Sequence, residues 1–184
     1  MAEENFHGYF WTNMLDDDGK PVIADDHPEA ASYKRYGIPG MWYAWGAHHD
    51  RFNIDAEPHA PNKFGWVVEV DPMDPTSVPV KHTALGRFRH EGAETTVASD
   101  GRLVVYMGDD NRFDYQYKYV SAGKVSDDRS ANSNLLSDGT LYVARFDADG
   151  TVNWLPLIHG EGPLTQENGF ADQGDVMIDA RIAA

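Results

Sequence analysis

The sequence has no cysteine, which excludes disulfide bonds, zinc–thiolate sites and a thiol nucleophile. Basic residues are also scarce: 15 Lys and Arg stand against 30 Asp and Glu, and the formal net charge is −15 at pH 7. Because nucleic acids and anionic membrane surfaces are bound by clustered Lys and Arg, neither is an expected partner. An acidic protein that acts on anions usually uses metal ions to do so.

Long apolar runs are also missing, and none approaches the ~20 residues that a membrane-spanning helix needs. We therefore expect no membrane insertion. The chain carries no glycine-rich phosphate loop, no serine nucleophile elbow and no metal-binding histidine pair on a helix. It also opens without a secretory signal peptide, and its abrupt ends favour a piece of a longer protein.

Residues 1–184 contain 41% hydrophobic residues, which is enough for a single domain with a real core. Residues 1–62 are irregular and rich in aromatic, acidic and histidine residues. Residues 63–158 are expected to form a β-meander or blades, and residues 170–184 a helix.

The strand predictions rest on alternation and on turn residues. In residues 113–120 three tyrosines alternate with polar residues, and a period of two predicts a strand with unlike faces. A Ser-Asp-Gly link, with Gly101 free to adopt a positive φ, joins the two preceding runs into a hairpin. Together these runs predict a three-strand antiparallel meander. The strands expected over the whole chain are residues 64–71, 80–85, 94–99, 103–107, 113–120, 140–147 and 151–157.

A weak repeat indicates the architecture. Trp66, Val104 and Tyr142 are equally spaced in the sequence, and each expected strand leads into a turn with an aspartate. A period near 40 residues, with several strands in each unit, is typical of a β-propeller blade. We therefore expect an all-β fold of antiparallel, propeller-like blades, a partial propeller with long aromatic and acidic loops and short helices. The internal identity is weak, so a β-sandwich with a similar number of strands stays open on the pattern alone.

Acidic residues gather at one end of the expected meander. Glu91 comes just before one strand and Asp109 and Asp110 just after the next, so their side chains are expected to meet at a shared end. Such a cluster favours a bound cation. Asp110 alone is equally well explained as a turn former, and Glu91 has the alternative of a solvated charge. His90 is adjacent, and orienting or capping the loop suits it better than binding a metal.

Other acidic and histidine-rich segments have simpler explanations. The triple aspartate 16–18 lacks the spacing and the closing glutamate of a helix-loop-helix calcium site, which favours a solvated turn. His48 and His49 are adjacent and would point to opposite faces of a strand, so a surface loop is favoured. Residues 147–150 imitate the start of a calcium loop, but strands on both sides favour a tight turn. A short helix is expected at residues 28–36, ended by the following glycine.

Several segments, taken in order, resemble the PhoX-type alkaline phosphatases, and the likeness covers nearly the whole chain. The segments are Glu3-Glu4-Asn5 before an aromatic loop, FGWVVEVDPMDP, GRFRHEGA, VVYMGDD with the following YKYVS, and the terminal GDVMIDARIAA. The resemblance implies a six-bladed propeller with calcium and iron ions at one end of its central channel, which hydrolyses phosphate esters. It also implies an exported protein with a periplasmic or extracellular location.

The resemblance also assigns candidate metal ligands. Glu91 and Asp110 match acidic ligands of the family, and Glu4 or its neighbour Glu3 matches an acidic ligand of the opening motif. Asp109 is kept as a further candidate. No catalytic residue is assigned.

Two departures from the family pattern bear on activity. In the opening motif the family has an iron-bridging cysteine where this chain has Ala2. The family also continues, beyond the terminal helix, to an arginine and a glutamate that contact phosphate and metal, and this chain stops before them. On its own the chain is therefore expected to be a poor or inactive phosphatase, and open blade edges are expected to promote association.

The preferred hypothesis is a metal-dependent phosphatase that hydrolyses phosphate monoesters. Cations held by carboxylates would neutralise the charge of the ester and of the transition state. Oxygen ligands suit calcium, and iron without sulfur would need further carboxylate or imidazole ligands. The alternative is a non-enzymatic, calcium-stabilised β-propeller module that binds a ligand or partner. The natural substrate, the oligomeric state and the number of ions are left open.

Overall fold

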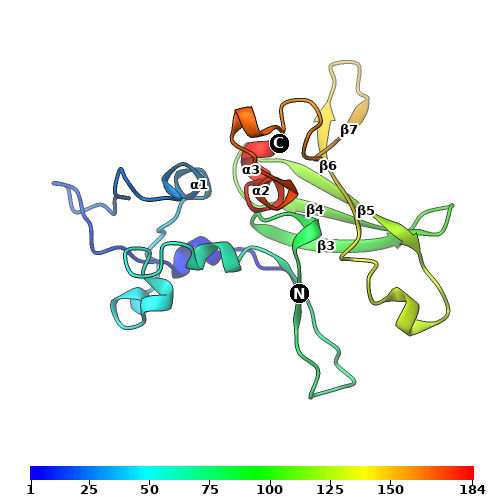
Figure 1. Ribbon diagram of the computed structural model, residues 1–184, viewed down its shortest axis with the longest axis horizontal. Coiled ribbons are helices and arrows are strands. Elements are labelled where there is room, and N and C mark those ends of the chain that lie inside the picture. Colours follow the sequence, from blue (N-terminus) through cyan, green and yellow to red (C-terminus); the bar gives the residue numbers. More distant parts are fainter. The chain divides into compact units, whose positions relative to one another are not determined.

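The structure, a computed structural model, describes residues 1–184, and its regular secondary structure is mainly antiparallel β-strands with short helices (Figure 1). The chain divides into two compact units, residues 1–4 with 66–184 and residues 5–65, and each is described by itself. That both belong to a single domain stays a prediction. None of the helices is both long enough and apolar enough to cross a membrane.

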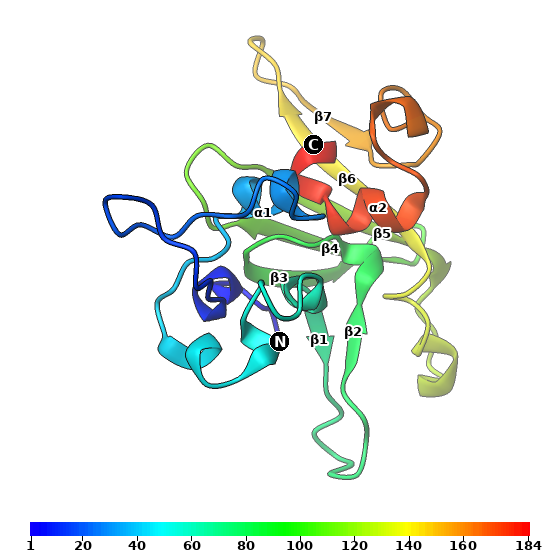
Figure 2. The same cartoon turned by 60° about the vertical axis from the view of Figure 1, so that its left-hand side comes forward.

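A five-stranded antiparallel meander is the main element of the first unit (Figure 2). Its strands follow one another in sequence order, so the predicted three-strand meander and the predicted second hairpin are confirmed and belong to one sheet. Gly101 and Gly150 take φ values of +90° and +86° in the turns before β4 and β7. The strands are β3 (His90–Val97), β4 (Arg102–Asp109), β5 (Gln116–Lys124), β6 (Gly139–Phe146) and β7 (Val152–Pro156).

Alternation of side chains gives this sheet one buried face. The C-terminal helices cover that face, because Val176, Met177 and Ala180 belong to the same apolar core. The Tyr117 hydroxyl also donates a hydrogen bond to the Ala180 carbonyl at 3.4 Å. The sheet contributes Val105, Met107, Tyr117, Tyr119, Leu141 and Val143 to this core.

The helix predicted at residues 170–184 is divided in two. The break falls at Asp179, whose φ and ψ of −105° and 39° are not helical. At the break the Ile178 carbonyl accepts a hydrogen bond from Arg87 Nε at 2.8 Å, so a side chain from outside the helix takes the place of a helical partner. The two helices are α2 (Gln173–Ile178) and α3 (Ala180–Ala183).

A separate two-stranded sheet is extended by the start of the chain. Ala2 forms an antiparallel bridge with Val67, and the Glu3 amide donates to the Trp66 carbonyl at 3.0 Å. Both strands are shorter than predicted, because Gly65 takes a φ of +93° before the first and a 3₁₀-helix follows the second. The strands are β1 (Val67–Glu69) and β2 (Val80–His82).

The equal spacing of Trp66, Val104 and Tyr142 was interpreted as a repeat of blade-like units. That interpretation is wrong, because the three residues do not occupy equivalent positions in separate sheets. Trp66 precedes β1, whereas Val104 on β4 and Tyr142 on β6 lie in the same sheet. Strands of similar length joined by short connections also recur at regular intervals within one meander. Regular spacing therefore does not by itself separate one sheet from several.

Residues 5–65 form the second unit, which has no β-strand of its own. The irregular backbone expected at the start of the chain is confirmed, and it surrounds a small apolar core made of Phe6, Phe10, Tyr33, Tyr36, Ile38, Ile54 and Ala60. The predicted helix is confirmed as α1 (Ala30–Tyr36), and Gly37 ends it in a left-handed conformation with φ of 71°. The 3₁₀-helices of the chain are η1 (Phe6–Tyr9), η2 (Ala44–Ala47), η3 (Asp50–Phe52), η4 (Ala60–Lys63), η5 (Thr83–Leu85), η6 (Arg129–Asn132) and η7 (Gln166–Asn168).

Leu141 and Leu155 lie on the same face of the sheet and allow a matched test of burial on that face. Leu141 on β6 is 1% exposed, whereas Leu155 on β7 is 38% exposed. Leu141→Ala should lower the free energy of unfolding by about 2–5 kcal/mol, because it removes buried methyl groups and leaves a cavity. Leu155→Ala should cost less than about 1 kcal/mol. Chemical denaturation followed by circular dichroism measures both losses, and equal losses would contradict this difference in burial between β6 and the edge strand β7.

Candidate metal centre

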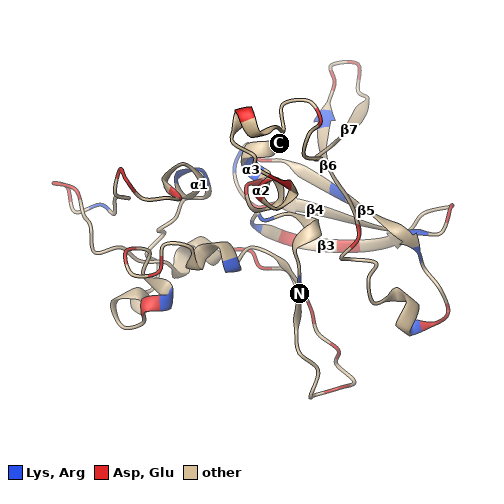
Figure 3. Ribbon diagram, in the orientation of Figure 1, with Lys and Arg blue, Asp and Glu red and all other residues tan.

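Acidic residues are spread over the chain (red in Figure 3), but one group brings carboxylates together. Glu4, Glu91 and Asp110 each offer an oxygen, and these oxygens all lie within 4.8 Å of one another. Glu91 and Asp110 are exposed and Glu4 is partly buried. The expected meeting of Glu91 and Asp110 at one end of the meander is confirmed, while their binding of a metal ion stays a prediction. We call these three residues the acidic cluster.

A β-bulge sets the position of Glu91. His90 pairs with Asp109 and Gly92 with Gly108, so Glu91 is an extra residue with no partner opposite it on β4. A bulge of this kind bends the strand and redirects a side chain at a sheet edge. Glu91 therefore leaves the regular alternation of β3 and joins the acidic cluster.

Backbone hydrogen bonds hold Asp110 at the end of β4. Its amide donates to the Arg89 carbonyl at 2.9 Å, which connects it to the residue before β3. The amide of Asp109 donates to the Tyr115 carbonyl at 3.1 Å, which connects the same turn to the start of β5. The backbone at Asp110 is thus connected to both neighbouring segments.

Glu4 and Glu3 are adjacent, but the structure places their carboxylates differently. The Glu3 carbonyl accepts from the His90 amide at 3.1 Å, which brings Glu4 next to the start of β3. The Glu3 side chain accepts from the Trp66 amide at 3.0 Å and forms an ion pair with Lys81 at 2.7 Å. The structure therefore brings Glu4, but not Glu3, into the acidic cluster.

Asp109 also lies outside the acidic cluster, in a buried ion pair with Arg181 of α3. Arg181 Nε donates to Asp109 Oδ2 at 2.6 Å, and Nη2 donates to Oδ1. Both side chains are fully buried. Burial raises the pKa of the Asp109 carboxyl, while the hydrogen bonds from Arg181 act in the opposite direction. Asp114 lies nearby, with Oδ2 3.9 Å from Arg181 Nη2.

Arg181 was not predicted from the sequence as a residue of the site, although one signal was present. It is a single arginine in the terminal segment GDVMIDARIAA, where Val176, Met177 and Ala180 are core residues. A charged residue on an apolar face is rarely buried without a partner of opposite charge. The partner could not be identified from sequence, because it lies 72 residues earlier in the chain.

Arg89 is a second residue near the acidic cluster that was not predicted from the sequence. Its Nη1 donates to Asn111 Oδ1 at 3.1 Å, beside Asp110. Burial lowers the pKa of Arg89, and the neighbouring Arg181 lowers it further, whereas Asp109 raises it. The guanidinium groups of Arg89 and Arg181 thus both lie close to the turn at Asp109 and Asp110.

His90 contacts the loop before β3, as expected for an orienting residue. The side chain is fully buried, and Nε2 lies 3.0 Å from the Gly86 carbonyl oxygen. Its ring also packs against Phe88, with 3.8 Å between ring centroids. His90 therefore fixes the chain immediately before Glu91.

The other acidic segments are turns. Asp16 Oδ1 accepts from the amides of Asp18 and Lys20 at 3.0 and 2.8 Å, within its own exposed loop. The amide of Gly150 donates to the Asp147 carbonyl at 3.0 Å in the turn before β7. Both segments therefore form the predicted turns.

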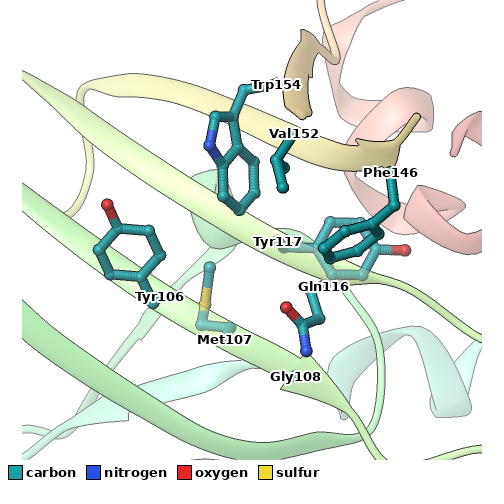
Figure 4. Close-up of a pocket in the computed structure, with 8 residues that line it drawn as sticks. All are labelled: Tyr106, Met107, Gly108, Gln116, Tyr117, Phe146, Val152 and Trp154. Carbon is teal, nitrogen blue, oxygen red and sulfur yellow. The ribbon is translucent and has the colours of Figure 1, made fainter. Parts of the chain in front are cut away.

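An open groove of ≈ 530 Å³ lies on the sheet (Figure 4). Lys118 lies on the same sheet, with Nζ 4.4 Å from the Trp154 ring centroid and 5.3 Å from that of Tyr142. Partial burial lowers the pKa of Lys118. Apolar and aromatic side chains dominate the lining, which consists of Tyr106, Met107, Gly108, Gln116, Tyr117, Phe146, Val152 and Trp154.

Comparison with known proteins identifies the family. The model of the family "Alkaline phosphatase PhoX" matches residues 1–184, so the chain belongs to this family. Among solved structures the chain is similar to "Pseudomonas fluorescens PhoX in complex with vanadate, a transition state analogue", with 42% sequence identity and a TM-score of 0.88. The match covers 100% of this chain and 32% of that chain, so the chain spans about a third of its length. No curated protein matches.

Glu91 and Glu94 allow a test of charge repulsion in the acidic cluster. Both glutamates are exposed on β3, but only Glu91 lies within 4.8 Å of two other carboxylates. In chelator at low salt, Glu91→Gln should raise the free energy of unfolding by up to about 1 kcal/mol, because a like charge at this distance is removed. The gain should shrink at high salt, and Glu94→Gln should give little change. Equal changes in thermal melting for both variants would contradict this electrostatic description.

Proposed function

We propose that the chain is part of a metal-dependent phosphatase that hydrolyses phosphate monoesters. The observation that carries the proposal is the convergence of Glu4, Glu91 and Asp110, from three separate segments, in a chain of the PhoX family. A second support is the similarity to a PhoX structure whose bound vanadate is described as a transition state analogue. Phosphate monoesters are accordingly the proposed substrate class.

We propose calcium as the ion at the acidic cluster. Calcium takes 6–8 oxygen ligands, including carboxylates, carbonyls and water. The three carboxylates would supply a part of this shell, and the exposure of Glu91 and Asp110 leaves room for water and substrate oxygens. Iron is proposed from the family resemblance alone. We assign it no ligand in this chain, because the cluster offers neither imidazole nor sulfur and Ala2 occupies the position of the family cysteine.

The charge of the chain explains why a cation would be needed. With a net charge of −15, the protein would repel a phosphate ester, and the exposed carboxylates would add to the repulsion at the site itself. A bound divalent cation would neutralise the ester and the charge that develops on the oxygens around phosphorus. Glu4, Glu91 and Asp110 bind and orient that cation in this proposal, while Arg89 adds a positive charge beside the turn.

We further propose that the five-stranded meander is a blade of a propeller. The proposal is supported by its antiparallel sequence-ordered strands, and by the family resemblance. The two edge strands, β3 and β7, would then lie against other parts of a longer protein. A periplasmic or extracellular location is proposed from the same resemblance.

Hydrolysis of a chromogenic phosphate monoester by the full-length protein tests the proposed activity. We expect turnover that is lost after treatment with chelator and restored when calcium and iron are returned. Tight calcium binding without hydrolysis of any monoester would overturn the proposal. That result would favour instead a calcium-stabilised binding module without catalytic activity.

Calcium should stabilise residues 1–184 through the acidic cluster. A cation that binds only the folded chain adds about 2.7 kcal/mol of stability at 100 times its dissociation constant, and it also removes carboxylate repulsion. The melting temperature should rise with calcium, and Glu91→Gln combined with Asp110→Asn should abolish most of the rise. Asp16→Asn combined with Asp18→Asn, in the exposed loop, is the control and should leave the rise unchanged. If calcium raises the melting temperature of the Glu91→Gln, Asp110→Asn variant as much as that of the unsubstituted chain, the ion binds elsewhere.

A further inference from the structure

We propose that Arg181, through its ion pair with Asp109, sets the affinity of the acidic cluster for its cation without touching the ion. Arg181 is in this sense a positioning residue. The inference rests on the proposed cation site. It adds a buried arginine on α3 to a site whose ligands come from the start of the chain, β3 and the end of β4.

The geometry of the ion pair leaves Asp109 little freedom. Two nitrogens of one guanidinium group donate to the two oxygens of one carboxylate, a planar fork that fixes both distance and orientation. Both side chains are fully buried, so neither can exchange its partner for water. Packing of α3 against the sheet, with Ala180 in the core, holds the arginine in place.

The constraint on Asp109 reaches two members of the acidic cluster through the backbone. Asp110 is the next residue, so its Cα position follows from that of Asp109. Asp109 also pairs with His90 in the register of β3 and β4, directly beside the bulge that redirects Glu91. The Asp110 amide closes the arrangement by its bond to the Arg89 carbonyl.

Positioning and simple electrostatics predict opposite results when Arg181 is lost. Loss of Arg181 removes a positive charge near the cluster, and on electrostatic grounds alone this change should tighten cation binding. If the main role of Arg181 is to hold Asp109 and Asp110 in place, its loss should weaken binding, because supporting residues commonly contribute 10–100-fold to metal affinity. Arg181→Lys separates the two effects, since lysine keeps the charge but cannot form the fork.

The test measures the calcium dissociation constant of residues 1–184 by calorimetry, at a temperature at which circular dichroism shows each variant to be folded. We expect Arg181→Lys to weaken binding by about 10-fold or more. Arg181→Gln, which removes the positive charge together with the fork, should also weaken binding, whereas loss of the charge alone would tighten it. This variant provides a second result if the lysine variant does not fold.

Arg87→Lys is the matched control. Arg87 is fully buried at the same helix junction, where Nε binds the Ile178 carbonyl and Nη2 lies 3.7 Å from Asp179. In the absence of calcium, Arg87→Lys should have a lower melting temperature than the unsubstituted chain. Its calcium dissociation constant should stay within about 2-fold of that of the unsubstituted chain, as expected for a site that is not coupled to the cluster.

The possible failures can be told apart. Unchanged or tighter calcium affinity in folded Arg181→Lys or Arg181→Gln, with affinity lost in Glu91→Gln combined with Asp110→Asn, would overturn the positioning role and leave the cation site standing. Calcium binding that survives the cluster variant would overturn the proposed site, and the positioning role with it.

Discussion

The buried ion pair between Arg181 and Asp109 is the constraint on which the rest of the candidate site depends. Removing two charges from water costs several kcal/mol, which is recovered only where geometry and hydrogen bonding are good. The bidentate contact between these two side chains meets that condition. Loss of one partner alone would leave an uncompensated buried charge, a change that typically costs 3–5 kcal/mol. The pair therefore favours one arrangement of α3 on the sheet and one position for the end of β4.

The acidic cluster, by contrast, lowers the stability of the metal-free chain. Its three carboxylates lie within 4.8 Å of one another in a chain that already carries a net charge of −15. A bulge and a set of backbone bonds keep them together against their repulsion. In the proposed function a cation relieves this repulsion, so the strain of the metal-free form becomes part of the affinity for the ion. The same cation would allow an acidic protein to bind an anionic ester.

The features that sequence predicted are those that depend on local pattern. Alternation and turn residues gave the strands of the meander, and a glycine gave the end of α1 at Gly37. The meeting of Glu91 and Asp110 followed from hairpin geometry, because the start of one antiparallel strand lies beside the end of the next. The equal spacing of strands did not identify separate blades, because the same spacing recurs within one sheet as well as between sheets. Features that depend on distant residues could not be predicted from the sequence. Which of Glu3 and Glu4 joins the acidic cluster, for example, depends on the contacts of the Glu3 side chain with Lys81 and Trp66.

A crystal structure of residues 1–184 grown with calcium is the most direct test of the central claim, that the acidic cluster is a cation site. We expect one ion bonded to carboxylate oxygens of Glu4, Glu91 and Asp110, at the roughly 2.3–2.6 Å typical of calcium. We also expect Asp109 to remain bonded to Arg181 and Glu3 to remain bonded to Lys81. Calcium bound elsewhere at saturating concentration, with no ion at these three carboxylates, would contradict the proposed cation site.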